Sequence, residues 1–223
     1  MKLRVLYGGT FDPVHDGHLT VARRARDLLG AQVALLPAGD PPHKGPTEAS
    51  AHDRAAMCRL AVAGERGLSV DTREVERTTP SWTVDTLRAL RREIGDEAPV
   101  ALIVGADSFL GLPTWKEWRT LPALAHFVVA ERPGSTLDAG MPPGLDAVLG
   151  SQFVDDPMRL HAAAAGLVLR MRQPPTPESA TLLRQRIAAG LPWQGWVPPA
   201  VAAYIVRHGL YGACTGTAPG PGL

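Results

Sequence analysis

Short apolar runs alternate with longer amphipathic segments along most of this chain. The apolar runs are typical of strands buried in a parallel sheet, and they lie at residues 3–9, 31–39, 68–75, 99–107, 126–134 and 166–171. The amphipathic segments carry apolar residues at helical spacing and cover residues 17–30, 49–64, 81–95, 177–190 and 198–209. This order predicts an α/β protein with a doubly wound, mainly parallel sheet, right-handed crossovers and C-terminal helices.

The same pattern sets the expected domain organisation. We expect residues 1–211 to form a single domain, with a C-terminal helical part at about 177–211. Residues 212–223 are rich in Gly, Pro and Thr, and we expect them to form a disordered tail. From about 134 to 160 the periodicity weakens and predicts mostly loop.

Composition narrows the classes of protein that the chain can represent. Its formal net charge is +1 and aromatic residues make up 5%, so nothing favours a nucleic-acid partner or an anionic membrane surface. The sequence has no signal-peptide architecture and no apolar run of roughly 20 residues that could span a bilayer. Cys58 and Cys214 lie far apart and indicate neither a disulfide framework nor a cysteine zinc site. We therefore expect a cytoplasmic enzyme or binding protein.

The stretch GGTFDPVHDGHL, residues 8–19, concentrates the candidate chemistry. Gly8 and Gly9 end a predicted strand, where backbone N–H groups can approach a ligand closely, and the helix that follows points its positive end at the same place. His15 and His18 share one helical face. Three interpretations compete: a phosphate-binding loop, a metal site, or a tight turn that needs glycine.

The histidines favour the phosphate interpretation. A metal site needs further ligands in suitable spacing, and the other histidines, at positions 43, 52, 126, 161 and 208, show none. A purely structural alternative, in which one histidine caps the helix and the other packs, stays open. We favour a pair of imidazole donors that face a phosphate group during its transfer, and we expect no metal ligand among the protein's side chains.

At this point the sequence resembles a known family. The stretch is similar to the GGTFDPxHxGH form of the HxGH motif found in bacterial nicotinate-mononucleotide adenylyltransferases, which belong to a superfamily with a Rossmann-like nucleotidyltransferase fold. Further matches are PPHK (41–44), PSWTVDTL (80–87), ERPG (131–134) and PESATLLRQRI (177–187). The resemblance covers most of residues 3–134 and 177–211. Two departures are Glu178, where the family usually has an aliphatic residue, and the poorly matching segment 134–165.

The resemblance implies adenylyl transfer from ATP to nicotinate mononucleotide, with release of pyrophosphate, as a step of NAD biosynthesis. It implies catalytic roles for His15, His18, Lys44 and Arg184. For ATP binding it implies Gly8, Gly9, Thr10, Phe11, His18, Gly105, Asp107, Ser179, Thr181 and Arg184. For the mononucleotide it implies Lys44, Trp82, Thr83, Trp115 and Arg132. Mg²⁺ is implied as the partner of ATP, held mainly by phosphate oxygens and water.

Several alternatives remain at this stage. The acceptor could be nicotinamide mononucleotide or another phosphomonoester such as phosphopantetheine, although pantetheine-phosphate adenylyltransferases are typically shorter and lack the other matches. Class I aminoacyl-tRNA synthetases carry a related motif, but this chain is short and has no KMSKS-like partner. A regulatory module that binds nucleotides without catalysis is disfavoured by the intact His15, His18, Lys44 and Arg184. The sequence leaves a homo-oligomer open.

Overall fold

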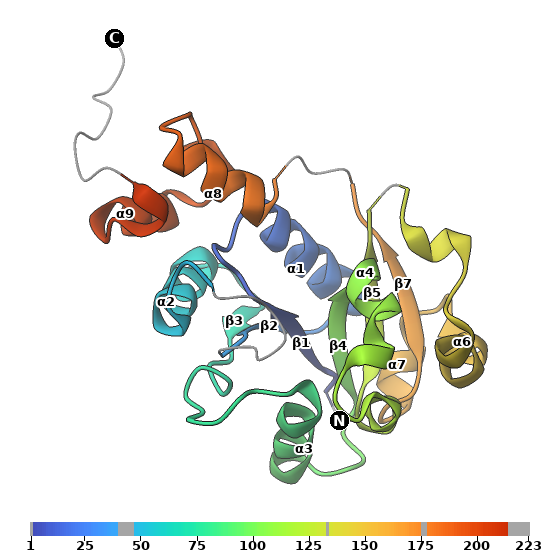
Figure 1. The fold of residues 1–223 in the computed structure, drawn as a ribbon. Helices are drawn as coiled ribbons and strands as arrows, with labels where there is room; N and C mark the ends of the chain where they lie inside the picture. Colours follow the sequence, from blue (N-terminus) through green and yellow to red (C-terminus); the bar gives the residue numbers. More distant parts are fainter. Residues whose placement is uncertain (1, 40–46, 133, 175–177, 214–223) are drawn as a thin grey trace.

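A twisted sheet of parallel strands forms the centre of the molecule (Figure 1). The structure is a computed structural model, and it describes residues 2–39, 47–132, 134–174 and 178–213. In this part of the chain seven strands occur in the order β3-β2-β1-β4-β5-β7-β6. The strands are β1 (Arg4–Gly9), β2 (Val33–Pro37), β3 (Leu68–Val70), β4 (Val100–Gly105), β5 (His126–Glu131), β6 (Phe153–Val154) and β7 (Val168–Arg172).

Helices connect the strands and cover both faces of the sheet. The described helices are α1 (Asp16–Leu29), α2 (Ala51–Val62), α3 (Thr83–Ile94), α4 (Ala106–Leu110), α5 (Leu121–Leu124), α6 (Pro143–Leu149), α7 (Arg159–Ala162), α8 (Ala180–Ala188) and α9 (Pro199–Arg207). A short 3₁₀ turn, η6 (Leu210–Gly212), follows α9. None of the helices in the described ranges is long and apolar enough to cross a membrane.

The strands are apolar on both sides because two separate cores lie against them. On one face Val5 and Tyr7 of β1 belong to a core that includes residues of α1, α2, α8 and α9. On the other face Leu6 packs in a core that includes residues of α3, α4 and α6. Burial on both faces explains why these strands read as continuous apolar runs rather than as alternating ones.

The predicted fold class is confirmed, and the six predicted strands all occur in it. The predicted strand 99–107 ends earlier, at Gly105, because α4 begins at Ala106 and places Asp107 in its first turn. The stretch 134–160, predicted as mostly loop, contains α6 and the two-residue strand β6 and leads into α7. These elements are too short to produce a clear period in the sequence. Residues 214–223 of the predicted tail lie outside the described residues.

The strand order places a natural ligand site at the carboxyl edge of the sheet. From β1 the chain moves outward to β2 and β3 and then returns to β4 on the other side of β1. The loops after β1 and β4 therefore leave the sheet toward opposite faces. In open α/β sheets, such a switch point opens the crevice in which ligands bind.

Candidate active site

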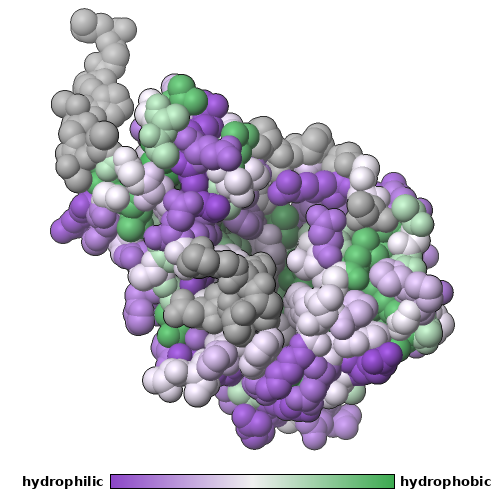
Figure 2. Space-filling view, in the orientation of Figure 1, coloured by the Kyte–Doolittle hydropathy of each residue, from purple (hydrophilic) through white to green (hydrophobic). Residues whose placement is uncertain are grey.

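The carboxyl ends of β1, β2 and β4 surround a hollow of about 160 Å³, and the face seen in Figure 2 is hollowed near its centre. The residues that line this hollow come from four parts of the chain: Gly8, Gly9, Thr10, Leu36, Ala38, Glu74, Ser81, Thr83, Leu102, Val104, Gly105, Ser108 and Trp115. Six of them are predicted ligand-binding residues. We call this cavity the central hollow.

A second hollow, of about 480 Å³, adjoins the first and shares Gly105 with it. Asp107 and Arg132, both exposed at the carboxyl edge, line it together with Ser108 and Ser135. A smaller recess of about 100 Å³ is lined by Gly17 of α1 and again by Arg132. The predicted ATP-binding residues Gly105 and Asp107 and the predicted mononucleotide contact Arg132 therefore lie around one connected region.

The loop after β1 is shaped by tight packing around Phe11. A side chain at Gly9 would place its Cβ 2.8 Å from the Phe11 ring, so packing alone requires glycine there. Phe11 is buried and adopts φ of +51°, a left-handed conformation that is rare for an aromatic residue. Its ring stands edge-on to Tyr7 and to His18, at centroid distances of 5.4 and 5.0 Å. The tight-turn interpretation thus explains Gly9, and the Phe11 side chain serves as packing.

Asp12 anchors this loop to two distant segments. Its carboxylate accepts hydrogen bonds from the backbone N–H groups of Glu48 and Ala49, at 2.9 and 3.1 Å, and from the hydroxyl of Tyr211, at 2.8 Å. The sequence analysis did not single out Asp12 or Tyr211. A buried carboxylate needs such donors, but the donors are 36 or more residues away and only the fold brings them together.

His15 and His18 lie against one another at the start of α1. Their ring centroids are 3.7 Å apart, and His15 is only 2% exposed. The backbone N–H of His15 donates to Nδ1 of His18 at 3.3 Å, so a neutral His18 carries its proton on Nε2 and presents an N–H donor there. Nδ1 of His15 is buried and has no hydrogen-bond partner among the described residues.

Both imidazoles are neutral at pH 7. Burial, and to a smaller extent repulsion by the nearby Arg132, lowers the pKa of His15 to about 4. For His18, burial is again the main cause of a pKa well below its usual value, followed by repulsion from His15 and Arg132. The positively charged Arg132 therefore lies near two uncharged imidazoles, those of His15 and His18.

The start of α8 lies against the same loop. Ser179 caps the helix by accepting a hydrogen bond from the backbone N–H of Leu182 at 3.2 Å. Arg184 donates from Nη1 to the backbone oxygen of Asp12 and pairs through Nε with Glu48, both at 2.7 Å. Thr181 is exposed in the first turn of the helix.

Glu178, the departure from the family pattern, does not cap the helix. Its carboxylate lies near Asp16 at the start of α1, and this repulsion, after burial, is the second cause that raises the pKa of Asp16. The two carboxylates add negative charge where two helix N-termini converge. Lys44 lies outside the described residues.

Trp115 and Thr83 line the central hollow on the side of α3. Trp115 is half-buried there, and Thr83 opens α3 beside it. The backbone N–H of Thr83 has no hydrogen-bond partner in the described ranges, as is usual for the first residue of a helix. Trp82 is the N-cap residue of α3 but does not line the hollow. Trp118, in contrast, is buried in the core.

Glu74 is a second buried acidic group that the sequence analysis missed. Glu74 lines the central hollow, and its carboxylate accepts a hydrogen bond from the Thr86 hydroxyl at 2.7 Å. Burial raises its pKa above the usual value for a glutamate. In the sequence, Glu74 stands near the end of the predicted strand 68–75, a position that is equally typical of a solvated side chain.

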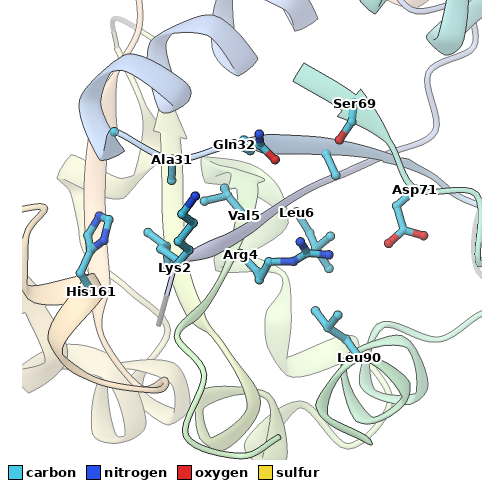
Figure 3. A pocket seen from close by; sticks show the side chains of 13 residues that line it. Lys2, Arg4, Val5, Leu6, Ala31, Gln32, Ser69, Asp71, Leu90 and His161 are labelled. Carbon is cyan, nitrogen blue, oxygen red and sulfur yellow. The ribbon is translucent and has the colours of Figure 1, made fainter. Parts of the chain in front are cut away.

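Another hollow, of about 430 Å³, lies at the opposite, amino edge of the sheet and is lined by residues such as Lys2, Arg4, Gln32, Asp71 and His161 (Figure 3). It contains none of the predicted site residues. In the part of the chain that the structure describes, no group of three or more His, Cys, Asp or Glu could hold a metal ion.

Comparisons with known proteins identify the family of this chain. The model of the cytidylyltransferase-like family matches residues 6–186. A protein of Stenotrophomonas maltophilia named "Probable nicotinate-nucleotide adenylyltransferase" is 52% identical over 216 residues, which cover 95% of this chain and 97% of the relative. A protein of the same name from Xylella fastidiosa (strain M12) is 45% identical over 215 residues, with 95% and 97% coverage.

Solved structures match the fold. The nicotinic acid mononucleotide adenylyltransferase of Plasmodium falciparum, complexed with NaAD, superposes with a TM-score of 0.70 at 15% identity and covers 97% of this chain and 100% of that one. The extent and identity of the sequence matches show that this chain belongs to the cytidylyltransferase-like family and, within it, to the nicotinate-nucleotide adenylyltransferases.

Proposed function

We propose that this protein transfers the adenylyl group of ATP to the phosphate of nicotinate mononucleotide and forms nicotinate adenine dinucleotide and pyrophosphate. The observation that carries the proposal is the closely packed, neutral pair His15 and His18 at the switch point of the sheet, next to Arg132, which lines one of the two hollows that share Gly105. Family membership points to the same reaction.

The chemistry requires positioning and charge stabilisation rather than an activated nucleophile. A phosphate oxygen of the mononucleotide attacks the α-phosphorus of ATP, and the bond from that phosphorus to the oxygen bridging to the β-phosphate breaks. The attacking oxygen is already anionic, so no general base is needed. Cys58 offers no competing nucleophile, because burial raises the pKa of its thiol to about 12 and only the thiolate reacts.

The proposed donors surround the phosphates. Nε2–H of His18 donates to the transferring phosphate, and His15 and Arg132 stabilise the negative charge that develops nearby. The start of α8 and Arg184 hold the departing pyrophosphate, for which Arg184 exchanges its pairing with Glu48 for phosphate oxygens. Mg²⁺ enters with ATP and is held by phosphate oxygens and water. Lys44 remains the predicted contact to the mononucleotide phosphate.

The central hollow is the proposed site of the pyridine ring. Trp115 supplies a flat surface for stacking, and the start of α3 at Thr83 offers a backbone donor to the carboxylate of nicotinate. Glu74 lines the same hollow, and an ionised carboxylate there would repel nicotinate. Its raised pKa reduces that repulsion. Nicotinamide mononucleotide is the competing acceptor.

Pyrophosphate release from MgATP tests the reaction itself. We expect release with nicotinate mononucleotide and much less with nicotinamide mononucleotide or phosphopantetheine. Comparable release with the nicotinamide substrate would retain the mechanism and contradict the proposed carboxylate recognition. The absence of release with all three acceptors would favour a module that binds nucleotides without catalysis.

Removal of the His18 imidazole should reduce turnover without unfolding the protein. Loss of one charge-stabilising donor typically lowers kcat by about 10²–10³-fold, and we expect His18→Ala to fall in that range. His161→Ala is the matched control, because His161 bonds the backbone oxygen of Leu29 at the amino edge and should leave kcat unchanged. Near-normal turnover of His18→Ala would contradict the assigned role.

The neutral state of His15 predicts a dependence of stability on pH. A histidine has a pKa near 6.5 in the unfolded chain, whereas the folded value for His15 is about 4. The unfolded state therefore binds more protons between these values, and the free energy of unfolding falls as the pH falls. From pH 7 to pH 5 this residue should account for about 2 kcal/mol.

His15→Asn, which cannot be protonated, should lose that part of the pH dependence. Urea unfolding of both proteins at pH 7, 6 and 5 measures the difference between their slopes. Parallel slopes would show that His15 is not a buried neutral group.

Trp115→Ala should weaken binding of the mononucleotide selectively. Stacking of a base on an aromatic side chain contributes about 1–3 kcal/mol, so we expect KM for nicotinate mononucleotide to rise about tenfold and KM for ATP to change little. Trp118→Phe serves as the control, since Trp118 packs in the core. Equal changes in both KM values for Trp115→Ala would remove Trp115 from the stacking role.

A further inference from the structure

Arg54 of α2 is a fully buried cation that reaches backbone oxygens beside the site. Its side chain is 0% exposed. Nη1 donates to the oxygens of Thr10 and Ala38 at 2.8 and 2.7 Å, and Nη2 donates to that of Gly39 at 2.9 Å. A further, longer bond runs from Nε to the oxygen of Ala49 at 3.3 Å. One guanidinium thus joins three separate segments of backbone.

Two of these segments form the wall of the central hollow. Thr10 follows β1, and Ala38 follows β2; both residues line the hollow. The backbone N–H of Ala38 also donates to the oxygen of Gly9 at 2.9 Å. Arg54 therefore lies where the chain leaves two neighbouring strands, and it sets the separation and orientation of their loops.

The peptide unit between Ala38 and Gly39 is held from two sides. Its oxygen accepts from Arg54, and its N–H interacts with the carboxylate of Glu74, which opposes the rise in the pKa of that group. These two groups point in opposite directions from a trans peptide, so Arg54 and Glu74 lie on opposite sides of it. The space is tight, because a Cβ at Gly39 would lie 2.6 Å from the backbone oxygen of Glu74.

Glu74 continues the connection to α3. Its carboxylate accepts a hydrogen bond from the hydroxyl of Thr86 in α3, and its backbone oxygen accepts one from the Ser81 hydroxyl at 3.1 Å. A chain of buried polar contacts thus runs from α2 through the 38–39 peptide to the start of α3. Ala38, Glu74 and Ser81 of this chain line the central hollow, and Arg54 lies behind that wall.

We propose that Arg54 is a positioning residue for the mononucleotide half of the site. It holds Ala38 and Gly39, which follow β2, against the loop after β1 and so sets the shape of the central hollow, without touching substrate. The loop after β1 has independent support from the three hydrogen bonds to Asp12, so loss of Arg54 affects Ala38 and Gly39 most. The inference rests on the proposed function, because it assigns the hollow to nicotinate mononucleotide.

Arg54→Lys is the direct test. Lysine retains the positive charge but lacks the planar fork of donors that bridges several carbonyl oxygens. A displacement of about 1 Å at a reacting group can cost about a hundredfold in rate. We expect KM for nicotinate mononucleotide to rise at least about tenfold, with KM for ATP changing much less.

Arg91 provides a matched control for a purely structural role. It is also a buried arginine, 5% exposed, whose guanidinium donates to backbone oxygens of Leu124, Ala164 and Asp96, at 2.7, 2.9 and 3.1 Å. These contacts lie at the amino edge of the sheet, away from the site. Arg91→Lys should lower the free energy of unfolding and leave both KM values unchanged. If the two variants give the same KM pattern, the proposal is overturned.

Glu74→Ala keeps the proposal testable if Arg54→Lys does not fold. This variant removes the other anchor of the same peptide unit and should also raise KM for the mononucleotide selectively. An unchanged KM in a folded Glu74→Ala variant would overturn the proposal as well. The wild-type protein is assayed first. If it releases no pyrophosphate, the proposed function itself is rejected. If it does release pyrophosphate, the KM values of the variants test the role of Arg54.

Discussion

The position of β1 between β2 and β4 is the constraint on which the site depends. Both neighbours pair with β1 in parallel register, so the three carboxyl ends lie at one edge while the connections leave in different directions. The loop after β1 brings its histidines to the start of α1, and β4 ends at Gly105, which lines both large hollows at the carboxyl edge. Parallel pairing thereby brings together residues between positions 8 and 115 that are far apart in the sequence.

Buried polar groups then hold the loops in place. Asp12, Arg54 and Glu74 are each at most 7% exposed, and removal of such groups from water is costly unless hydrogen bonds replace the lost hydration. Each has replacements from distant segments: backbone N–H groups and a tyrosine hydroxyl for Asp12, carbonyl oxygens for Arg54, and a threonine hydroxyl and an amide for Glu74. Since each group would be left unsatisfied if its loop moved, these contacts favour one arrangement of the site over alternatives.

The electrostatic character of the site follows from the same burial. Low local hydration keeps His15 and His18 neutral, so they can serve as N–H donors. The cationic charge near them comes from Arg132, while Arg184 is paired with Glu48. Glu178 and Asp16 add negative charge near the two helix starts. The proposed Mg²⁺ would offset part of the phosphate charge beside these carboxylates.

The sequence by itself determined the alternation of strands and helices and the parallel sheet, and it supplied the motifs around His15, Thr83, Asp107 and Ser179 from which the site is predicted, because these depend on local period and on short stretches of chain. It did not predict the short elements between 134 and 165, where no period develops. It also missed Asp12, Arg54, Glu74 and Tyr211, whose partners are up to 199 residues away. Only the tertiary structure decided that Gly9 is needed by the Phe11 ring and that the histidines are uncharged, since close packing and loss of hydration arise only when distant segments meet.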